Sequence, residues 1–347
     1  MEALNKILEQ FQIPEVKYKF EIISNGFIND TYMVSAEGRP EYILQRINTD
    51  VFTNIDALMH NLDLVLPLLK HDDYKTIKLV KTALGDSFIK TETNHVWRLM
   101  TFIKDSLTYN TTTNPKVAFE AGKIIGLFHT ILNNFDAELL EDTLPNFHNV
   151  SYRYQQFNEA LVNAKPDNIK NSQKAIDFVK KNIELLLKIK VDDLPVKVCH
   201  NDTKLNNILF SNKKALCLID LDTIMKGTFL YDFGDAVRTI ANTADEDEKN
   251  LSKINFTNEL FDAFVDGLAV HKDSLAKKEI DFLSLGVVLM PFLHGIRALT
   301  DYLENNRYYK VSYETQNLDR CMSLFTFAQL ALDKQKYMKK RILDKLC

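Results

Sequence analysis

Residues 198–210 read VCHNDTKLNNILF, and residues 216–222 read LCLIDLD. Each stretch contains an apolar run typical of a short buried strand, and a dense polar segment, residues 200–207, lies between them. Polar side chains are uncommon in a protein interior unless they are hydrogen-bonded or take part in chemistry. The spacing of the polar residues is H-x-D-x-K-x-x-N, and the second apolar run ends at Asp220. We therefore take this strand–loop–strand segment as the centre of both the fold and the function.

The composition disfavours several common classes of enzyme. The 347 residues contain only ten glycines, which is less than half of the roughly 7% average usage. Their positions form no G-x-G-x-x-G, no G-x-x-x-x-G-K-[ST] and no G-x-S-x-G. A Rossmann dehydrogenase, a Walker-type nucleotidase and a standard α/β-hydrolase are therefore disfavoured.

Charge and cysteine usage indicate the kind of partner and the compartment. The balance of 43 basic and 47 acidic residues, a net charge of −4, favours neither nucleic acid nor a membrane as partner, so we expect a small molecule. The sequence makes no prediction of oligomeric state. No C-x-x-C pair occurs, which favours a reducing compartment, and the first residues contain no apolar stretch of signal-peptide length. We therefore expect a cytoplasmic protein. Residues 282–293 form the longest apolar stretch; it is too short for a membrane helix and predicts a buried core helix.

The periodicity of apolar residues divides the chain into two parts. Short strand-like runs separated by turn residues dominate the first hundred residues, with one helix over 54–69. Beyond residue 105 a helical spacing takes over, interrupted by the strand-rich segment 196–222. We predict an α+β protein with two lobes, residues 1–104 and 105–347, and a ligand site between them. The expected strands are 18–24, 31–36, 41–47, 77–81, 87–90 and 95–103, and the further helices are 117–135, 151–163, 171–190, 256–270, 276–300 and 314–343.

The polar loop has the spacing of a phosphoryl-transfer site. A kinase catalytic loop, H-R-D-L-x-x-x-N, places its Asp and Asn five positions apart, as are Asp202 and Asn207. Such a reaction needs one carboxylate to take the proton of the acceptor hydroxyl, and an amide and a second carboxylate to hold Mg²⁺ against the nucleotide phosphates. We assign Asp202 the first role and Asn207 with Asp220 the second. Lys204 would place a positive charge beside the transferring phosphate. His200 completes the catalytic set, as a support of the loop rather than as the base.

The triplet Asp232-Phe233-Gly234 spells the DFG motif that supplies a metal-binding Asp in protein kinases. Protein kinases separate the loop Asp from the metal Asp by roughly eighteen residues. Asp220 lies eighteen residues after Asp202, whereas Asp232 lies thirty after it. We therefore interpret Asp232 as a residue that braces the catalytic loop.

These segments resemble a known group of enzymes. The residues from His200 to Asn207, with Asp220 and Asp232, are similar to the aminoglycoside phosphotransferase and choline kinase superfamily, which has a protein-kinase-like fold and transfers the γ-phosphate of ATP to small molecules. Within it, the chain resembles the N-acetylhexosamine 1-kinases, which phosphorylate the anomeric hydroxyl of N-acetylglucosamine or N-acetylgalactosamine. The segments that carry this second resemblance are N-G-x-I-N-x-T-Y at 25–32, YILQ at 42–45, HNDTKLNN at 200–207, IDLDTIM at 219–225, DFGD at 232–235 and DYLE at 301–304.

The resemblance implies a two-lobed kinase that uses ATP and Mg²⁺ and takes an amino sugar as substrate. It covers about residues 20 to 310. One position departs from the family, because Thr239 stands where the family can carry an aromatic residue in the sugar pocket. Asp202 is the implied base, Asn207 and Asp220 are the implied Mg²⁺ ligands, and Thr223, Arg297 and Tyr308, with Asp202, are the implied substrate contacts.

The expected nucleotide contacts lie in the first lobe. The turn at 25–31 would bind phosphate through backbone N–H groups. The strand that carries Lys in the kinase motif V-A-I-K offers Gln45 or Arg46 instead. Residues 97–103 lie where a kinase hinge would hydrogen-bond adenine. The candidate nucleotide-binding residues are Asn25, Gly26, Asn29, Thr31, Gln45, Arg46, Thr101 and Ile103.

The sequence leaves alternatives open. A kinase of the same fold could act on an amino alcohol, an aminoglycoside or another sugar. The chain could also be a catalytically silent kinase-like binding protein or a helical scaffold. Glu21, Asp235 and Arg238 could equally be structural ion-pair residues and are left out of the catalytic set. The acidic run 245–248 is interpreted as the solvated start of a helix.

Overall fold

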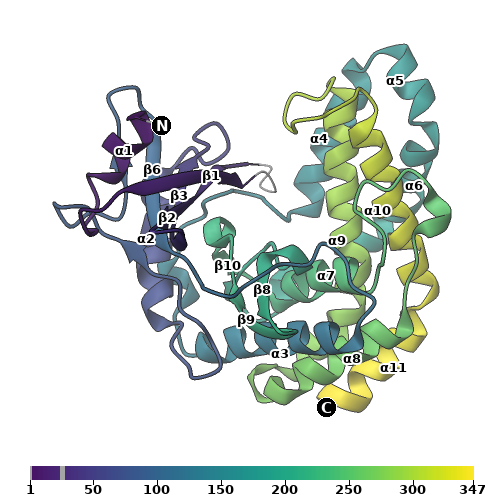
Figure 1. The fold of residues 1–347 in the computed structure, drawn as a ribbon. Helices are drawn as coiled ribbons and strands as arrows, with labels where there is room; N and C mark the ends of the chain where they lie inside the picture. Colours follow the sequence, from purple (N-terminus) through teal and green to yellow (C-terminus); the bar gives the residue numbers. More distant parts are fainter. Residues whose placement is uncertain (1, 24–27) are drawn as a thin grey trace.

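The computed structural model describes residues 2–23 and 28–347 (Figure 1). In this part of the chain six strands form one antiparallel sheet in the order β1-β2-β3-β6-β4, with β5 paired to β6. Figure 1 shows this sheet on the left and the C-terminal helices on the right. The predicted α+β class and the meander over 18–47 are confirmed. The strands are β1 (Tyr18–Ile23), β2 (Asp30–Ala36), β3 (Arg39–Ile47), β4 (Leu79–Val80), β5 (Ile89–Lys90) and β6 (Val96–Thr101).

The two faces of the sheet differ in character. Because side chains alternate along a strand, Leu44 and its cross-strand partner Leu99 share one face, where they pack in a small core with Leu8 of α1 (Glu2–Leu8). The other face carries a polar row, since the register aligns Thr31 with Gln45 and Gln45 with Arg98. The helix α2 (Ile55–Val65) begins at Asn54, whose side chain accepts a hydrogen bond from the backbone of Ala57, and it packs into the main core.

The C-terminal part is built around α9, the expected core helix. This helix is long and apolar enough to cross a membrane, but 78% of its apolar window is buried inside the protein. It packs against α4, α7, α10 and α11. The helices are α3 (Pro115–Ile131), α4 (Val150–Asn163), α5 (Pro166–Asn171), α6 (Gln173–Leu187), α7 (Phe229–Ile240), α8 (Asn258–Leu268), α9 (Lys277–Leu303), α10 (Gln316–Asp333) and α11 (Gln335–Leu346).

The strand-rich segment 196–222 forms a platform between the sheet and the helices (Figure 1). It contains β7 (Lys197–Cys199) and the hairpin of β8 (Ile208–Ser211) with β9 (Lys214–Leu218). The strand β10 (Met225–Gly227) follows and pairs antiparallel with β7. The polar loop at 200–207 therefore connects two short strand pairs.

One glycine of the scarce set has a clear packing role. A Cβ atom on Gly234 of α7 would lie 2.1 Å from the backbone oxygen of Gly286 in α9. Because such a contact is impossible, α7 and α9 can approach this closely only with glycine at the crossing. Gly234 of the DFG triplet thus serves helix packing.

Three local expectations are wrong. The helix α7 was not predicted, although its apolar residues recur at helical spacing and Asp232 and Asp235 lie on the other side of the helix. The helix expected over 314–343 is two helices, α10 and α11, which are separated at Lys334. Residues 245–248 form no helix start. Instead, Glu246 of this run forms ion pairs with Arg238 and Arg320.

Candidate active site

The catalytic loop runs from the end of β7 to the start of β8. Asn201 has a φ of 62° and Asp220, which follows β9, has a φ of 60°. Asn and Asp tolerate this left-handed conformation better than other non-glycine residues. A single 3₁₀ turn, Leu205–Asn207, ends the loop. These backbone features bring the two ends of the hairpin, Asn207 and Asp220, to the same edge, where the backbone N–H of Ile219 donates to the carbonyl of Asn207 at 2.8 Å.

Asp232 braces this loop, as predicted. Its carboxylate is fully buried and accepts hydrogen bonds from the backbone N–H groups of His200 (2.8 Å) and Asn201 (2.7 Å) and from the ring of His129 (2.9 Å). The hydroxyl of Thr203 donates to the backbone carbonyl of Asp232 at 2.6 Å. The DFG triplet therefore lies in the helix under the loop, and its Asp is occupied by structural contacts.

His200 positions its neighbours and does not act as a proton-transfer residue. Its Nε2 lies 2.8 Å from the carbonyl oxygen of Ile219, which can only accept, so Nε2 carries the proton. The other nitrogen, Nδ1, accepts from the backbone N–H of Asp202 at 3.2 Å. The ring is fully buried. These contacts agree with the expected role of His200 as a support of the loop, within the residues that the structure describes.

Two neighbours hold the carboxylate of Asp202 through one oxygen. Lys204 Nζ lies 2.8 Å from Oδ2, and Asn207 Nδ2 donates to the same oxygen at 2.9 Å and to the backbone carbonyl of Asp202 at 2.8 Å. Burial lowers the pKa of Lys204, but Asp202 and Asp220 raise it, and the net pKa lies above the ordinary value, so this ammonium group is charged. Among the described residues, Oδ1 of Asp202 is left available to accept a proton.

Asp220 lies across from this pair in a crowded group of carboxylates. Although its side chain has exposed surface, desolvation by the surrounding protein, followed by repulsion from Asp222 and Asp202, raises the pKa of Asp220 to about 6. Lys204 opposes this shift. Because Asn207 uses its amide nitrogen on Asp202, its amide oxygen is the atom available to a cation. A hard divalent cation prefers such oxygen ligands and would relieve the repulsion, so Asn207 and Asp220 fit Mg²⁺.

A buried arginine that the sequence reasoning missed connects the sheet to this site. Arg98 is 1% exposed, its Nε and Nη2 donate to Gln45 Oε1 at 3.0 and 2.7 Å, and its Nη1 lies 2.5 Å from Asp222 Oδ1. The second oxygen of Asp222 accepts from Asn29 Nδ2 at 2.7 Å, and Gln45 Nε2 donates to Thr31 at 3.0 Å. A polar chain therefore spans the two lobes. The one available signal was an arginine in an otherwise apolar strand run, VWRLM at 96–100.

This polar chain involves the position on β3 where kinases carry a lysine and this chain offers Gln45 or Arg46. The side chain of Gln45 accepts from Arg98 and donates to Thr31, and its role as a phosphate contact stays a prediction. Arg46 forms an ion pair with Asp30 on the neighbouring strand, and both side chains are partly exposed. Arg98, from the strand next to β3, is a buried arginine that reaches Asp222 across the lobe interface.

The remaining nucleotide candidates are distributed along the first lobe. Asn25 and Gly26 lie outside the described residues. Asn29 accepts from the backbone N–H of Asn48 at 3.0 Å, in addition to its contact with Asp222. Thr101 ends β6, where its backbone N–H donates to Lys78, and Ile103 follows in the connection to the helical lobe. An adenine contact by the backbone of Thr101 and Ile103 stays a prediction.

Two threonines from the other side of the loop hold its backbone. The hydroxyl of Thr223 donates to the carbonyl of His200 at 2.7 Å, and Thr223 is buried; its role as a substrate contact stays a prediction. The hydroxyl of Thr239 accepts from the backbone N–H of Leu205 at 2.9 Å. Thr239 therefore supports the loop from α7 at the position where the family can carry an aromatic residue.

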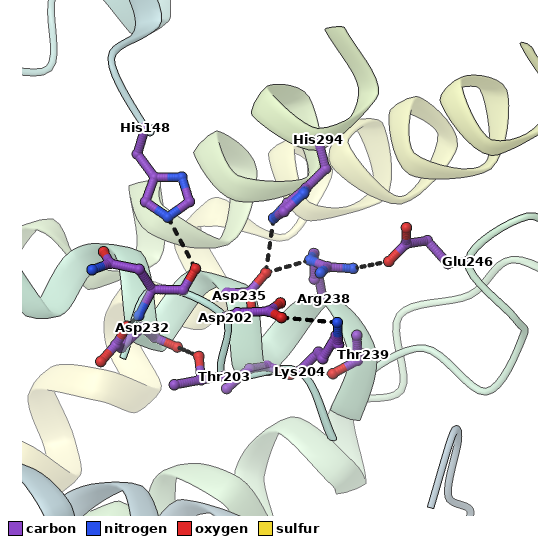
Figure 2. Close-up of polar contacts among 12 residues, drawn as sticks. His148, Asp202, Thr203, Lys204, Asp232, Asp235, Arg238, Thr239, Glu246 and His294 are labelled. Atoms are coloured by element: carbon purple, nitrogen blue, oxygen red, sulfur yellow. Dashed lines mark hydrogen bonds and ion pairs between the residues drawn. The ribbon is translucent and has the colours of Figure 1, made fainter. Parts of the chain in front are cut away.

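Charged side chains beyond the loop form a paired network (Figure 2). Asp235 lies 2.6 Å from Arg238 Nε and 3.0 Å from His294 Nε2, and Arg238 Nη1 lies 2.5 Å from Glu246. Burial favours a neutral Asp235, but Arg238 and His294 outweigh it and hold the pKa of Asp235 well below its usual range. The interpretation of Asp235 and Arg238 as structural ion-pair residues is confirmed.

The other two substrate candidates, Arg297 and Tyr308, come from α9 and from the segment that follows it. Arg297 lies over the ring of Phe147, 4.7 Å from its centroid, next to His148. His148 Nε2 in turn lies 3.1 Å from the carbonyl of Asn201 in the loop. Tyr308 is 48% exposed and contacts Tyr309 edge to face. The structure thus brings Arg297 to the side of the loop opposite the sheet, whereas the role of Tyr308 stays a prediction.

Known structures share this fold over nearly their whole length. A microcompartment-associated aminopropanol kinase has a TM-score of 0.62 and 16% identity, with 98% of this chain and 99% of that chain covered. A choline kinase from Cryptosporidium parvum Iowa II has a TM-score of 0.56 and 15% identity, with 99% and 96% covered. A spectinomycin phosphotransferase, in complex with ADP and spectinomycin, has a TM-score of 0.58 and 14% identity, with 95% and 97% covered.

The family model of the phosphotransferase enzyme family matches residues 19–266, which include all of β1 but its first residue, β2 to β10, the loop with Asp202 and Asn207, and α7 with Asp232. The match therefore covers the catalytic loop and the strands and helix that hold it, and ends before α9, which carries His294 and Arg297. The chain belongs to the phosphotransferase enzyme family and is, as a member of that family, an ATP-dependent small-molecule kinase.

Proposed function

We propose that this kinase phosphorylates the anomeric hydroxyl of an N-acetylhexosamine, such as N-acetylglucosamine or N-acetylgalactosamine, to give the sugar 1-phosphate. The observation that carries the assignment of the catalytic centre is the one-sided fixation of Asp202. Lys204 and Asn207 both hold Oδ2, which orients Oδ1 for an incoming hydroxyl. The choice of sugar is supported by the sequence segments at 25–32, 42–45, 200–207 and 219–225, which resemble the N-acetylhexosamine 1-kinases.

The proposed reaction transfers one phosphoryl group and one proton. The C1 hydroxyl donates its proton to Asp202 as its oxygen forms a bond to the γ-phosphorus, and the bond between that phosphorus and the bridging oxygen of ADP breaks. The ammonium group of Lys204, 2.8 Å from Asp202, lies where it can neutralise the charge of the transferring group. Mg²⁺, when bound, neutralises charge on the nucleotide phosphates, and Asn207 and Asp220 would hold it.

A second candidate function is phosphorylation of an amino alcohol or aminoglycoside by the same centre. It is favoured by the full-length similarity to an aminopropanol kinase, a choline kinase and a spectinomycin phosphotransferase. These similarities stand at 14–16% identity, so they bear on the fold and leave the acceptor open.

A coupled ADP-release screen tests the proposal. Free hexoses, N-acetylhexosamines and amino alcohols are compared at equal concentration with ATP and Mg²⁺, and phosphorus NMR identifies the phosphorylated position of the product. We expect turnover with N-acetylhexosamines and a phosphate on C1. A phosphomonoester on a primary or another ring hydroxyl would contradict the anomeric assignment. No turnover with any acceptor would favour a silent binding protein.

A further inference from the structure

The motif D-Y-L-E at 301–304 begins with a buried acidic residue on α9. Asp301 follows His294 and Arg297 on this helix, at distances of seven and four residues. Residues at these spacings share one face of a helix. His294 of this face pairs with Asp235, and Figure 2 shows its ring directed toward that carboxylate, above the catalytic loop. Asp301 therefore lies on the face of α9 that is turned toward α7 and the loop.

The carboxylate of Asp301 organises the backbone that follows α9. It is 3% exposed, and its two oxygens accept from the backbone N–H groups of Tyr308 at 2.7 Å and of Tyr309 at 3.0 Å. The second oxygen also accepts from the side-chain amide of Asn317 in α10 at 2.8 Å. Burial of a carboxylate is costly unless donors surround it, and hydrogen bonds to an ionised group are stronger than neutral ones. The carboxylate therefore favours one conformation of the α9–α10 segment, residues 304–315.

This conformation is not one that the backbone favours by itself. Asn305 and Asn306 both have positive φ values, 66° and 56°, a left-handed conformation that residues other than glycine adopt at a cost. The amide of Asn317 donates both to Asp301 and to Asn306 Oδ1, and Asn306 Nδ2 donates to the carbonyl of Glu314 at 2.8 Å. The hydrogen bonds around Asp301 thus compensate for an unfavourable turn.

The two tyrosines that Asp301 fixes lie near Arg297. The ring of Tyr309 lies under the guanidinium group of Arg320, 5.1 Å from the ring centroid. Burial raises the pKa of Tyr309, and the charges of Arg297 and Arg320 oppose this rise, so both arginines lie close to the phenol. Tyr308 is 48% exposed, and its ring contacts Tyr309 edge to face, with 4.8 Å between the centroids. An exposed ring is therefore fixed on the side of the catalytic loop that carries Arg297.

Further contacts hold the α9–α10 segment against the residues that follow α7. Asp247 accepts from Gln316, the first residue of α10, at 2.9 Å. Lys249 Nζ lies over the ring of Tyr313, 3.8 Å from its centroid. The helix α7 itself supports the catalytic loop through Thr239. The segment is thus connected to the helix on which the loop rests.

We propose that Asp301 is a positioning residue of this kinase, which holds the α9–α10 segment in one conformation so that the segment forms a wall of the acceptor site, with Tyr308 on its exposed side. Asp301 acts through this segment and does not contact the acceptor. The inference rests on the proposed function only for the place of the acceptor beside Asp202. It applies equally to a sugar and to an amino alcohol, and it gives the motif at 301–304 a role in acceptor affinity.

The decisive variant is Asp301→Asn, which keeps the shape of the side chain and turns one accepting oxygen into an NH2 group that faces N–H donors. The KM for N-acetylglucosamine should rise at least about fivefold, whereas kcat and the KM for ATP should stay within about twofold, because only binding of the acceptor is weakened. Loss of folded protein would instead lower kcat and leave both KM values unchanged. Glu304→Gln, at the exposed acidic residue of the same motif, is the matched control and should change none of the three.

Amide hydrogen exchange measures the conformation of the segment directly. The N–H groups of Tyr308 and Tyr309 should exchange at least about tenfold faster in Asp301→Asn, while α9 and α10 keep their protection. A double variant tests whether Asp301 acts through the segment. Tyr308→Ala should raise the acceptor KM, and the addition of Asp301→Asn should then raise it by no more than about twofold further.

The outcomes separate failure of this inference from failure of the proposed function. Unchanged exchange at Tyr308 and Tyr309, an unchanged acceptor KM in Asp301→Asn, or an equal rise in the KM for ATP would overturn the inference. Turnover of 1-amino-2-propanol alone, with the same rise in its KM, would support the inference and contradict the anomeric assignment.

Binding decides the case in which the parent protein releases no ADP with either acceptor. Ligand-detected NMR then compares N-acetylglucosamine binding by the parent protein and by Asp301→Asn, with ADP and Mg²⁺ present. Weaker binding by the variant would support the inference and contradict the proposed reaction. Equal binding, or none by the parent protein, would overturn the inference.

Discussion

The two sides of the catalytic loop differ in how completely their carboxylates are paired with positive charges or hydrogen-bond donors. On the sheet side, Asp202, Asp220 and Asp222 lie close together. Burial, and then the negative charges of Asp222 and Asp202, raise the pKa of Asp220 to about 6. Arg98 and Lys204 compensate only part of this charge. On the far side, Asp235 and Glu246 are paired with Arg238, and Asp301 accepts from backbone N–H groups. The first side therefore keeps excess negative charge that suits a cation with phosphates, whereas these carboxylates of the second side are neutralised or hydrogen-bonded within the protein.

The largest effect is expected at the residue between the two sides. Asp202→Asn keeps an oxygen for Lys204 but removes the proton acceptor, so kcat should fall by about 10²–10⁴-fold. Nucleotide affinity should change little, because the metal candidates Asn207 and Asp220 are intact. Steady-state ADP release and nucleotide titration measure the two effects. Retained turnover would show that Asp202 is not the base.

The buried ion pair on the sheet side gives the next largest effect. Arg98→Gln leaves the carboxylate of Asp222, whose side chain is 3% exposed, without its cation, which should lower the free energy of unfolding by about 3–5 kcal/mol. The KM for ATP should also rise, because the lobes lose their connection. Denaturant unfolding and ATP kinetics measure both.

A matched arginine on the adjacent strand is the control for Arg98. The ion pair of Arg46 with Asp30 has side-chain exposures of 39% and 36%, so Arg46→Gln should cost no more than about 1 kcal/mol.

In the double variant Arg98→Gln/Asp222→Asn, the loss of stability should be smaller than the sum of the two single losses. Additive losses would mean that the pair does not couple the lobes.

The support of the loop from α7 is testable with a nearly isosteric change. Thr239→Val removes the hydroxyl that accepts from the N–H of Leu205, a residue that is fully buried, and should cost about 1–3 kcal/mol of stability and reduce kcat. Thr239→Ser retains the hydroxyl and should keep most of both. A loss in Thr239→Ser as large as that in Thr239→Val would contradict the assignment of the effect to the hydroxyl.

The smallest effect concerns pH on the far side. Burial, followed by the nearby positive charges, lowers the pKa of His148 and of His294 below 6.5 in the folded protein. The unfolded chain then binds more protons below pH 6.5, so stability should fall as the pH drops below that value, by at most about 1.4 kcal/mol per pH unit for each ring. Thermal unfolding between pH 7.5 and 5.5 measures this slope. His294→Gln should reduce it, and an unchanged slope would contradict the assignment.

Short-range patterns made much of the site predictable. The five-residue spacing of Asp202 and Asn207, the strand that ends at Asp220, and the role of Asp232 could all be read along the chain, because a tight loop and its hairpin fix these residues locally. Helix α7 was missed although its apolar residues have a helical spacing. Glu246 was read as solvated because its ion-pair partners lie in other elements, Arg238 in α7 and Arg320 in α10.

The sequence by itself determined the catalytic loop, the α+β division and the family to which the chain belongs. Only the tertiary structure decided which cation pairs with the carboxylates on the sheet side and which charged side chains pair with each other on the far side. Arg98 reaches Asp222 through the register of β3 with β6, and Asn29 meets Asp222 across 193 residues of chain. Such pairings depend on distances between separate elements, which residue spacing does not encode, whereas loop geometry depends on a few consecutive residues, which it does.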